Sequence, residues 1–314
     1  MKHQVLITCP NLINTIEHFR ATFAQYNIEI TIPHFEQQLS EEELLRIIGQ
    51  FDGVIAGDDP FTARVLEQGK RLKVLAKWGI GVDGIDLKAA ERLGIPVINT
   101  PGVFSDEVAD TAVGYIILLA RQLHQIDRAV HNGEWLKPLG ISLRGKTLGI
   151  VGVGNIGKAL GRRGDVMGMR LLGYDLYPIS SEYLAEVGME QVALKQLLMN
   201  ADFIVLCCNL THENYHLLDE QAFTLMKHGV RIVNVARGPL IDEIALLKAI
   251  ENQKVAGAAL DVFEKEPLPW DSALRNYDNC IFGAHNSSNT FEAVMRVNEM
   301  AIQNLVKGLE RVPA

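Results

Sequence analysis

Short apolar runs alternate with longer amphipathic stretches from one end of the chain to the other. The runs have the length of buried strands, and the stretches between them have the spacing of helices with one apolar face. Such alternation predicts α/β units built around parallel sheets. Strands are expected near residues 5–8, 29–32, 53–56, 73–77 and 96–98, and a second series near residues 147–151, 171–175, 202–207, 230–235, 255–260 and 279–282.

Three helical stretches stand out between the predicted strands, and the last two indicate how the two series of strands are connected. Residues 40–49 begin with Ser40 and Glu43 at the spacing of a capping box. Residues 107–122 form a long apolar helical stretch that leads toward the second series. Residues 290–308 have no strand to accompany them, so this last helix is expected to return to the first sheet. The second series would then be a domain inserted into the first, with a hinge and a cleft at the two crossings.

The first strand of the second series runs directly into Gly152, Gly154 and Gly157, spaced as Gly-x-Gly-x-x-Gly, and then into a helical stretch. Gly152 permits the tight turn, Gly154 lets the backbone approach a pyrophosphate, and Gly157 lets helix and strand pack closely. The helix N-terminus favours an anion. Asp175 ends the next strand, at about the spacing of an acid that bonds a ribose hydroxyl. A carboxylate there repels a 2′-phosphate, so the expected cofactor is NAD rather than NADP.

The composition narrows the choice of partners and compartment. The chain has 314 residues, 48% of them hydrophobic and 22% charged, which suits a soluble globular protein of two domains. The formal net charge of −8 argues against nucleic acid as the main partner, because phosphate binding needs a cationic face. No apolar run reaches the ~18 residues of a membrane span. The four cysteines lack CxxC spacing, which favours buried reduced thiols in a cytoplasmic protein.

Polar residues follow three late strands, at the sheet edge where ligands bind in open α/β folds. A guanidinium at Arg237 suits a carboxylate, although an arginine there could also brace the turn. Asp261 could reach a cofactor amide, although most such acids are solvated. His285 is suited to proton transfer if Glu266 stabilises its charged form, although a lone histidine is more often structural. The set indicates 2-hydroxyacid dehydrogenase chemistry.

The chain resembles the D-isomer-specific 2-hydroxyacid dehydrogenases, a family that includes D-3-phosphoglycerate dehydrogenase, glyoxylate reductase and D-lactate dehydrogenase. The segments that carry the resemblance are Lys77-Trp-Gly-Ile-Gly-Val-Asp-Gly-Ile-Asp86, Gly94-Ile-Pro-Val-Ile-Asn-Thr-Pro-Gly102, the glycine loop, Val235-Ala-Arg237-Gly and Asp261-Val-Phe-Glu-Lys-Glu266-Pro. The resemblance agrees with two Rossmann-like, doubly wound parallel-sheet domains. The NAD-binding domain would cover residues 103–284, inserted into a substrate domain made of residues 1–102 and 285–314. A homodimer is also implied.

The resemblance assigns roles to individual residues. The catalytic positions fall on Arg237, Glu266 and His285. The cofactor positions fall on Gly152, Gly154, Asn155, Ile156, Gly157, Asp175, Cys208, Val235, Ala236 and Asp261, and the substrate positions on Lys77, Ile80, Gly81 and Arg237. No metal is expected. Near the third strand the chain has Asp58 and Asp59, which would repel a phosphate, so a phosphorylated substrate is not favoured unless Lys77 or Arg64 compensates.

Two other functions compete with this one. His212-Glu213-Asn-Tyr-His216 fits the H-E-x-x-H pattern of zinc peptidases, but it directly follows a strand, whereas that mechanism needs both histidines on one face of a helix. The second alternative is an NAD(H)-sensing protein, like the co-repressors related to this family, which binds the dinucleotide without significant turnover. Turnover with 2-oxo acids distinguishes the enzyme from such a sensor.

Overall fold

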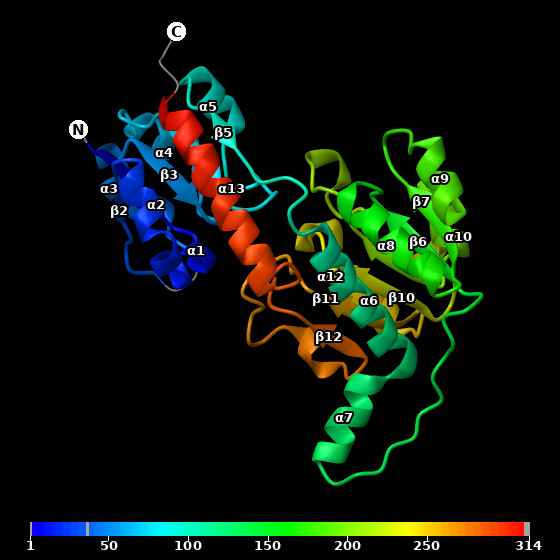
Figure 1. Ribbon diagram of the computed structural model, residues 1–314. Helices are drawn as coiled ribbons and strands as arrows, with labels where there is room; N and C mark the ends of the chain where they lie inside the picture. Colours follow the sequence, from blue (N-terminus) through cyan, green and yellow to red (C-terminus); the bar gives the residue numbers. More distant parts are fainter. Residues whose placement is uncertain (1, 36–37, 311–314) are drawn as a thin grey trace. The chain divides into compact units, whose positions relative to one another are not determined.

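The computed structural model describes residues 2–35 and 38–310, which divide into two compact α/β units (Figure 1). Unit 1 takes the chain up to Val103 and again from Thr290 onward, and unit 2 is Phe104–Asn289. Unit 2 thus extends beyond the boundary expected after residue 284. The physical reason is that His285 N donates a hydrogen bond to the carbonyl oxygen of Asp261 (2.7 Å), which ties the segment after residue 284 to unit 2.

Unit 1 contains a five-stranded parallel sheet in the order β2-β1-β3-β4-β5. Its strands are β1 His3–Ile7, β2 Ile28–Thr31, β3 Gly53–Ala56, β4 Val74–Lys77 and β5 Val97–Ile98. Its helices are α1 Pro10–Asn14, α2 Arg20–Gln25, α3 Glu41–Ile47, α4 Ala63–Gln68, α5 Leu87–Arg92 and α13 Phe291–Glu310. The capping box predicted at Ser40 and Glu43 is present at the start of α3.

Both faces of the first sheet are covered, because successive side chains of each strand point to opposite faces. Val5, Ile7 and Ile55 pack with α1, α2 and α13 in one apolar cluster. Leu6 and Val54 pack with α3, α4 and α5 in another. Figure 1 shows α13, in red, lying along this sheet, as expected for the helix that returns from the end of the chain.

Unit 2 contains a seven-stranded parallel sheet in the order β12-β11-β10-β9-β6-β7-β8. Its strands are β6 Thr147–Val151, β7 Arg170–Tyr174, β8 Met189–Gln191, β9 Phe203–Leu206, β10 Val230–Asn234, β11 Val255–Leu260 and β12 Cys280–Phe282. The strand order reverses at β6, whose neighbours are β7 and β9. Ligands of doubly wound sheets bind at such a switch point.

The sequence missed the edge strand of this sheet. Each expected strand is present, with ends shifted by no more than two residues, but β8 was not predicted. Its residues Glu190 and Gln191 are exposed, and only Met189 is buried. A three-residue edge strand with one apolar side chain is too short to show alternation.

Helices complete unit 2, and one of them leaves the sheet. They are α6 Ser105–Arg121, α7 Leu123–His131, α8 Asn155–Val166, α9 Ser181–Val187, α10 Leu194–Asn200, α11 Glu220–Leu225 and α12 Glu243–Glu251. The predicted stretch 107–122 corresponds to α6, which ends where Gln122 adopts a left-handed φ of 55°. Figure 1 shows α7 continuing away from the sheet and an irregular segment returning to β6.

Two general expectations can be compared with the described residues. No helix among them is long and apolar enough to cross a membrane. Cys9 and Cys280 are buried and Cys207 and Cys208 are partly buried, all four as free thiols. Burial raises the pKa of Cys208 to about 11, so this thiol, beside the glycine loop, is protonated near neutral pH.

Candidate active site

The glycine loop at the end of β6 has the geometry of a phosphate-binding turn. Gly152 has a φ of 92°, and a Cβ there would lie 2.5 Å from the backbone nitrogen of Cys208, in the loop after β9. A Cβ at Gly157 would lie 2.1 Å from the carbonyl oxygen of Gly152, so helix α8 can approach the turn only without a side chain. A Cβ at Gly154 would meet no atom within 4 Å, because this glycine borders open space. The three glycines therefore differ in their surroundings, and their roles at a cofactor phosphate remain predictions.

Helix α8 presents an N-terminus suited to an anion. Gly154 is its N-cap and no side chain caps it, and Asn155 and Ile156 open its first turn. Its leading backbone N–H groups can therefore bind phosphate oxygens. Asp175, just after β7, accepts hydrogen bonds from Val153 N (2.8 Å) and Tyr177 N (3.1 Å). These bonds orient the carboxylate beside the loop, so the residues present fit NAD.

A buried asparagine shapes the turn that carries Arg237. Asn234, the last residue of β10, accepts a hydrogen bond from Ala236 N (3.0 Å) and donates one to the carbonyl oxygen of Arg237 (2.9 Å). Val235 and Ala236 are buried in this turn. Arg237 is partly buried, and its Nη1 donates to the carbonyl oxygen of Ala236 (2.7 Å). Sequence reasoning missed Asn234, although a polar residue ending an apolar strand was a usable signal.

His285 and Glu266 form a direct pair. His285 Nδ1 lies 2.8 Å from Glu266 Oε2, and Glu266 Oε1 accepts a hydrogen bond from Phe263 N (3.0 Å). The carboxylate fixes the tautomer, since Nδ1 must carry a proton to donate to it. The side chains are 41% and 36% exposed, which leaves the pair open to a small molecule. The sequence predicted this partnership, and the structure brings the two residues together from the loops that follow β11 and β12.

Electrostatics connect Arg237 to the same pair. Burial opposes ionisation of Glu266, but the hydrogen bond and charge of His285 outweigh it. The Phe263 N–H and the charge of Arg237 also help to hold the pKa of Glu266 below its usual value. The glutamate is therefore an anion near neutral pH, and it can stabilise a protonated imidazole. The carboxylate of Glu266 is thus influenced both by the imidazole of His285 and by the charge of Arg237.

Asp261 has a structural task that the sequence did not suggest. Its buried carboxylate accepts hydrogen bonds from Asn286 N (3.2 Å), Ser287 N (2.9 Å), the Ser287 hydroxyl and the Tyr115 hydroxyl (3.3 Å). Burial and the negative charge of Asp261 raise the pKa of Tyr115, so its hydroxyl stays protonated and donates. These bonds hold the segment that follows His285. Contact of Asp261 with the cofactor remains a prediction.

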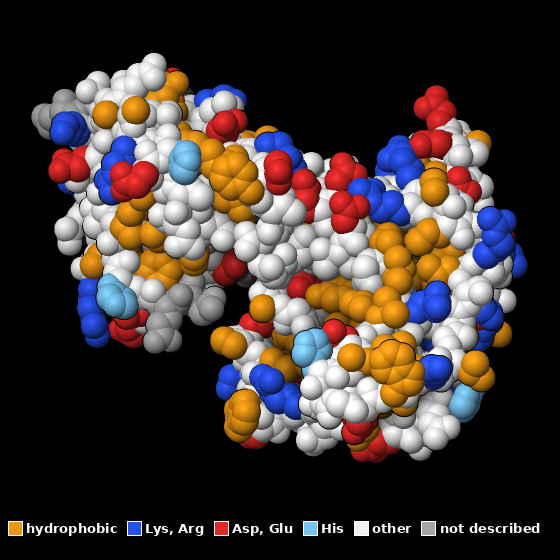
Figure 2. Space-filling model, turned by 60° about the horizontal axis from the view of Figure 1, so that its bottom comes forward, with side chains coloured by type: hydrophobic (Ala, Val, Ile, Leu, Met, Phe, Trp, Pro, Cys, Tyr) orange, Lys and Arg blue, Asp and Glu red, His pale blue; other side chains and the backbone are white. Residues whose placement is uncertain are grey.

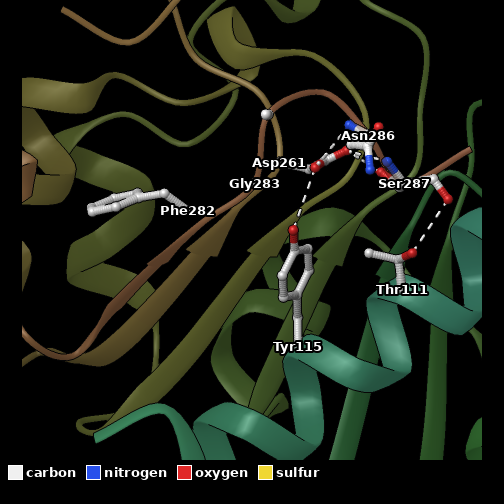
Figure 3. Close-up of a pocket in the computed structure, with 8 residues that line it drawn as sticks. Thr111, Tyr115, Asp261, Phe282, Gly283, Asn286 and Ser287 are labelled. Carbon is white, nitrogen blue, oxygen red and sulfur yellow. Dashed lines mark hydrogen bonds between the residues drawn. The ribbon is translucent and has the colours of Figure 1, made fainter. Parts of the chain in front are cut away.

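A pocket of about 350 Å³ borders this network. Its lining includes Tyr115 and Thr111 from α6, and Figure 3 shows both side chains pointing from the helix toward Asp261 and Ser287. Thr111 Oγ1 donates to the carbonyl oxygen of Ser287 (3.3 Å). A Cβ at Gly283 would lie 2.1 Å from Asp261 Oδ1, so a glycine is required at the floor. Helix α6 therefore helps to support the His285 segment.

The predicted substrate residues of unit 1 lie at the end of β4 and in the turn after it. Lys77 is buried, and its Nζ donates to Asp58 Oδ1 (3.0 Å) and to the carbonyl oxygen of Trp78 (2.7 Å). Ile80 and Gly81 are partly buried in the next turn, where Asn99 Nδ2 donates to the carbonyl oxygen of Ile80 (2.8 Å). The carboxylate of Asp59 is buried, bonded to the hydroxyl of Thr8 and to Leu39 N (2.8 Å). Burial raises the pKa of Asp59, which makes it a structural acid.

The peptidase alternative is wrong on geometry. Only His212–Asn214 form a helical turn, and it is a 3₁₀ turn. His216 lies outside it, with a left-handed φ of 54°, so the two histidines do not share a helix face. No group of three or more His, Cys, Asp or Glu side chains that could hold a metal occurs within residues 2–35 and 38–310.

Comparison with known proteins agrees with this geometry. Residues 113–287 match the family model described as D-isomer specific 2-hydroxyacid dehydrogenase, NAD binding domain. The chain is 37% identical to a glyoxylate reductase of Korarchaeum cryptofilum over 287 residues, covering 87% of this chain and 86% of that protein. It is 41% identical to the D-3-phosphoglycerate dehydrogenase of Homo sapiens over 279 residues, covering 87% of this chain and 52% of that protein. A D-lactate dehydrogenase from Aquifex aeolicus, solved with NAD and lactic acid, superposes with a TM-score of 0.85 at 26% identity, covering 96% and 93% of the two chains.

Proposed function

This chain belongs to the D-isomer specific 2-hydroxyacid dehydrogenases, and we propose that it uses Arg237, Glu266 and His285 to interconvert a small 2-hydroxy acid and its 2-oxo acid. Family membership makes it an NAD-dependent oxidoreductase. The observation that carries the assignment of residues is the 2.8 Å contact between His285 Nδ1 and Glu266 Oε2, within the field of Arg237. The similarity to named enzymes does not favour the alternative of a dinucleotide sensor without turnover.

Each of the three side chains has a defined task. The guanidinium of Arg237 binds the carboxylate of the 2-oxo acid and polarises its carbonyl group. His285, protonated and stabilised by Glu266, donates the proton on Nε2 to the carbonyl oxygen. Bound NADH supplies the hydride to the carbonyl carbon. In the oxidative direction His285 takes the proton from the hydroxyl group, and Glu266 again stabilises the charge that forms.

We propose an unphosphorylated substrate such as glyoxylate. Several relatives are named glyoxylate reductases. Lys77 could have offset the negative charges that would repel a substrate phosphate, but it already pairs with Asp58. Arg64, the other candidate, pairs with Glu41 and Glu42. Lys77, Ile80 and Gly81 remain proposed substrate residues. The chain spans about half the length of the D-3-phosphoglycerate dehydrogenase relatives, so their activity is not transferred to it.

A panel of 2-oxo acids tests the function. Purified protein should oxidise NADH with glyoxylate, pyruvate or hydroxypyruvate faster than with 3-phosphohydroxypyruvate, and faster than it oxidises NADPH. His285→Ala should lower kcat by about 10²–10⁴, the usual contribution of a positioned acid, with NADH affinity kept. His228→Ala, an exposed histidine before β10, is the matched control. Binding of NADH without oxidation by any of these acids would show that the chain is not a dehydrogenase of this kind.

We also propose a homodimer that covers the segment after α7. Trp135 and Leu139 are 78% and 95% exposed, and Leu136 is 43% exposed. Figure 2 shows hydrophobic side chains, in orange, open on the face of unit 2 that it displays. Grouped apolar side chains of this kind are typical of interfaces. Sedimentation should give twice the chain mass, and Trp135→Ser with Leu139→Ser should give the single-chain mass. An unchanged mass in the double variant would exclude this segment as the dimer interface.

We propose a cytoplasmic location for the protein, because its four cysteines are free thiols.

A further inference from the structure

His285 adopts a backbone conformation that a residue with a side chain rarely takes. Its φ is 52°, in the left-handed region, where the backbone crowds a Cβ. Such a conformation persists only where the surrounding contacts hold it. It is also the conformation in which Nδ1 of the imidazole lies 2.8 Å from Glu266 Oε2. The contacts that fix this backbone therefore bear on the proposed acid/base pair.

Asp261 holds the backbone at His285 and directly after it. Its carbonyl oxygen accepts a hydrogen bond from His285 N (2.7 Å). Its carboxylate accepts one from Asn286 N (3.2 Å, to Oδ1) and one from Ser287 N (2.9 Å, to Oδ2), and the Ser287 hydroxyl also donates to Oδ2. Three consecutive N–H groups, beginning at His285, thus bond to one residue that is 1% exposed. The orientation of the Asp261 carboxylate therefore helps to set the course of the chain after the histidine.

Helix α6 contacts both that carboxylate and the segment that it anchors. The Tyr115 hydroxyl donates to Asp261 Oδ1 (3.3 Å), as Figure 3 shows. Thr111, four residues earlier and so on the same face of α6, donates to the carbonyl oxygen of Ser287 (3.3 Å). A Cβ at Gly283 would lie 2.1 Å from Asp261 Oδ1 and 2.4 Å from the Tyr115 hydroxyl oxygen, so only a glycine lets these two groups meet there. Two side chains of one helix thus hold the acid and the segment that follows the histidine.

We propose that Tyr115 is a positioning residue for His285: its hydroxyl orients Asp261, which holds the left-handed backbone that directs the imidazole at Glu266. This inference rests on the proposed function. The imidazole and Glu266 are coupled, since the hydrogen bond and charge of His285 lower the pKa of Glu266. Without the hydroxyl, the Asp261 carboxylate loses one donor, and the backbone at His285 should relax. The contact with Glu266 then lengthens, so a protonated imidazole is less well stabilised.

Tyr115→Phe tests the proposal, because it removes the hydroxyl and keeps the ring. The alkaline limb of kcat/KM for glyoxylate reduction should move to lower pH. The loss on its alkaline side should be about two- to threefold, the lower end for one hydrogen bond, because donor and acceptor are 3.3 Å apart. In the Glu266→Gln background the same change should move the limb no further, because the charge interaction that it supports is already gone. Tyr277→Phe is the matched control, since the Tyr277 hydroxyl also donates to a carboxylate, that of Glu251 (2.7 Å).

A measurement without turnover separates this inference from the proposed function. The imidazole of His285, identified in NMR spectra by its absence from His285→Ala, should titrate at lower pH in Tyr115→Phe than in the wild type. Thr111→Val, which removes the other donor of α6, should shift the titration in the same direction. Equal titration in the wild type, Tyr115→Phe and Tyr277→Phe, or a movement of the pH limb that adds fully to that of Glu266→Gln, would overturn the inference and leave the dehydrogenase intact. A wild type that binds NADH and reduces no 2-oxo acid would overturn the proposed function, and the titration of His285 would then decide the positioning by itself.

Discussion

Replacing Glu266 with Gln removes the charge that faces His285 and keeps the shape of the side chain. The hydrogen bond from Phe263 N (3.0 Å) can pass to the amide oxygen, so the loop should stay in place. The amide nitrogen then faces His285 Nδ1, where the wild type has a carboxylate oxygen at 2.8 Å. The pKa of Glu266 is held below its usual value, so the wild-type group is an anion throughout the assay range. The substitution therefore tests one interaction, the support of a protonated imidazole.

The expected effect of Glu266→Gln on the protonation of His285 depends on how exposed the two side chains are to solvent. A hydrogen bond to a charged group contributes about 1.5–3 kcal/mol. The two side chains are 41% and 36% exposed, so solvent screening reduces this to about 1 kcal/mol. That energy is about fivefold in the protonation equilibrium of the imidazole. Removing the anion favours the neutral ring, so both the alkaline limb for reduction and the acidic limb for oxidation should move to lower pH.

The assay is kcat/KM against pH in both directions, with NADH and glyoxylate or with NAD and glycolate. For reduction, Glu266→Gln should match the wild type at low pH and fall about fivefold below it at high pH. For oxidation, the variant should be the faster enzyme at low pH. Glu190→Gln, which alters an exposed ion pair with Arg170, is the control. An equal loss at every pH in both directions would refute the reasoning and make Glu266 a purely structural residue.

Three further changes separate the parts of the cofactor site. Gly157→Ala puts a Cβ against the Gly152 carbonyl oxygen at 2.1 Å and should destabilise the fold by about 1–3 kcal/mol, seen as a lower Tm. Gly154→Ala faces open space, so its Tm should match the wild type while NADH fluorescence titration gives weaker binding; equal affinity would remove Gly154 from the phosphate site. Asp175→Ala should weaken NADH binding and narrow its advantage over NADPH, and an unchanged ratio of the two Kd values would contradict the ribose assignment.

The strands were predictable because they depend on local sequence pattern. The sheet edge that carries the polar candidate site residues was predictable for the same reason. Buried parallel strands are apolar runs, and residues that follow them meet at one edge. Arg237, Glu266 and His285 were proposed in this way, and the structure places Glu266 and His285 in contact. The short strand β8 was not predicted, because two of its three side chains are exposed. The continuation of unit 2 past residue 284 was not predicted either. It depends on hydrogen bonds between the segment after His285 and Asp261, and the spacing of apolar residues does not reveal such bonds.

The sequence did not reveal the contacts that support the proposed catalytic residues. Tyr115 and Asp261 are joined by a hydrogen bond, yet they belong to a helix and a strand end far apart in the chain. His216 looked like half of a zinc motif because its neighbours in sequence include another histidine, whereas in space its neighbours are carboxylates. A motif fixes residue types at a spacing, but the backbone angle at His216, a φ of 54°, decides where the side chain points. The same two histidines on a regular helix would share a face, whereas the local backbone at His216 places its side chain beside carboxylates.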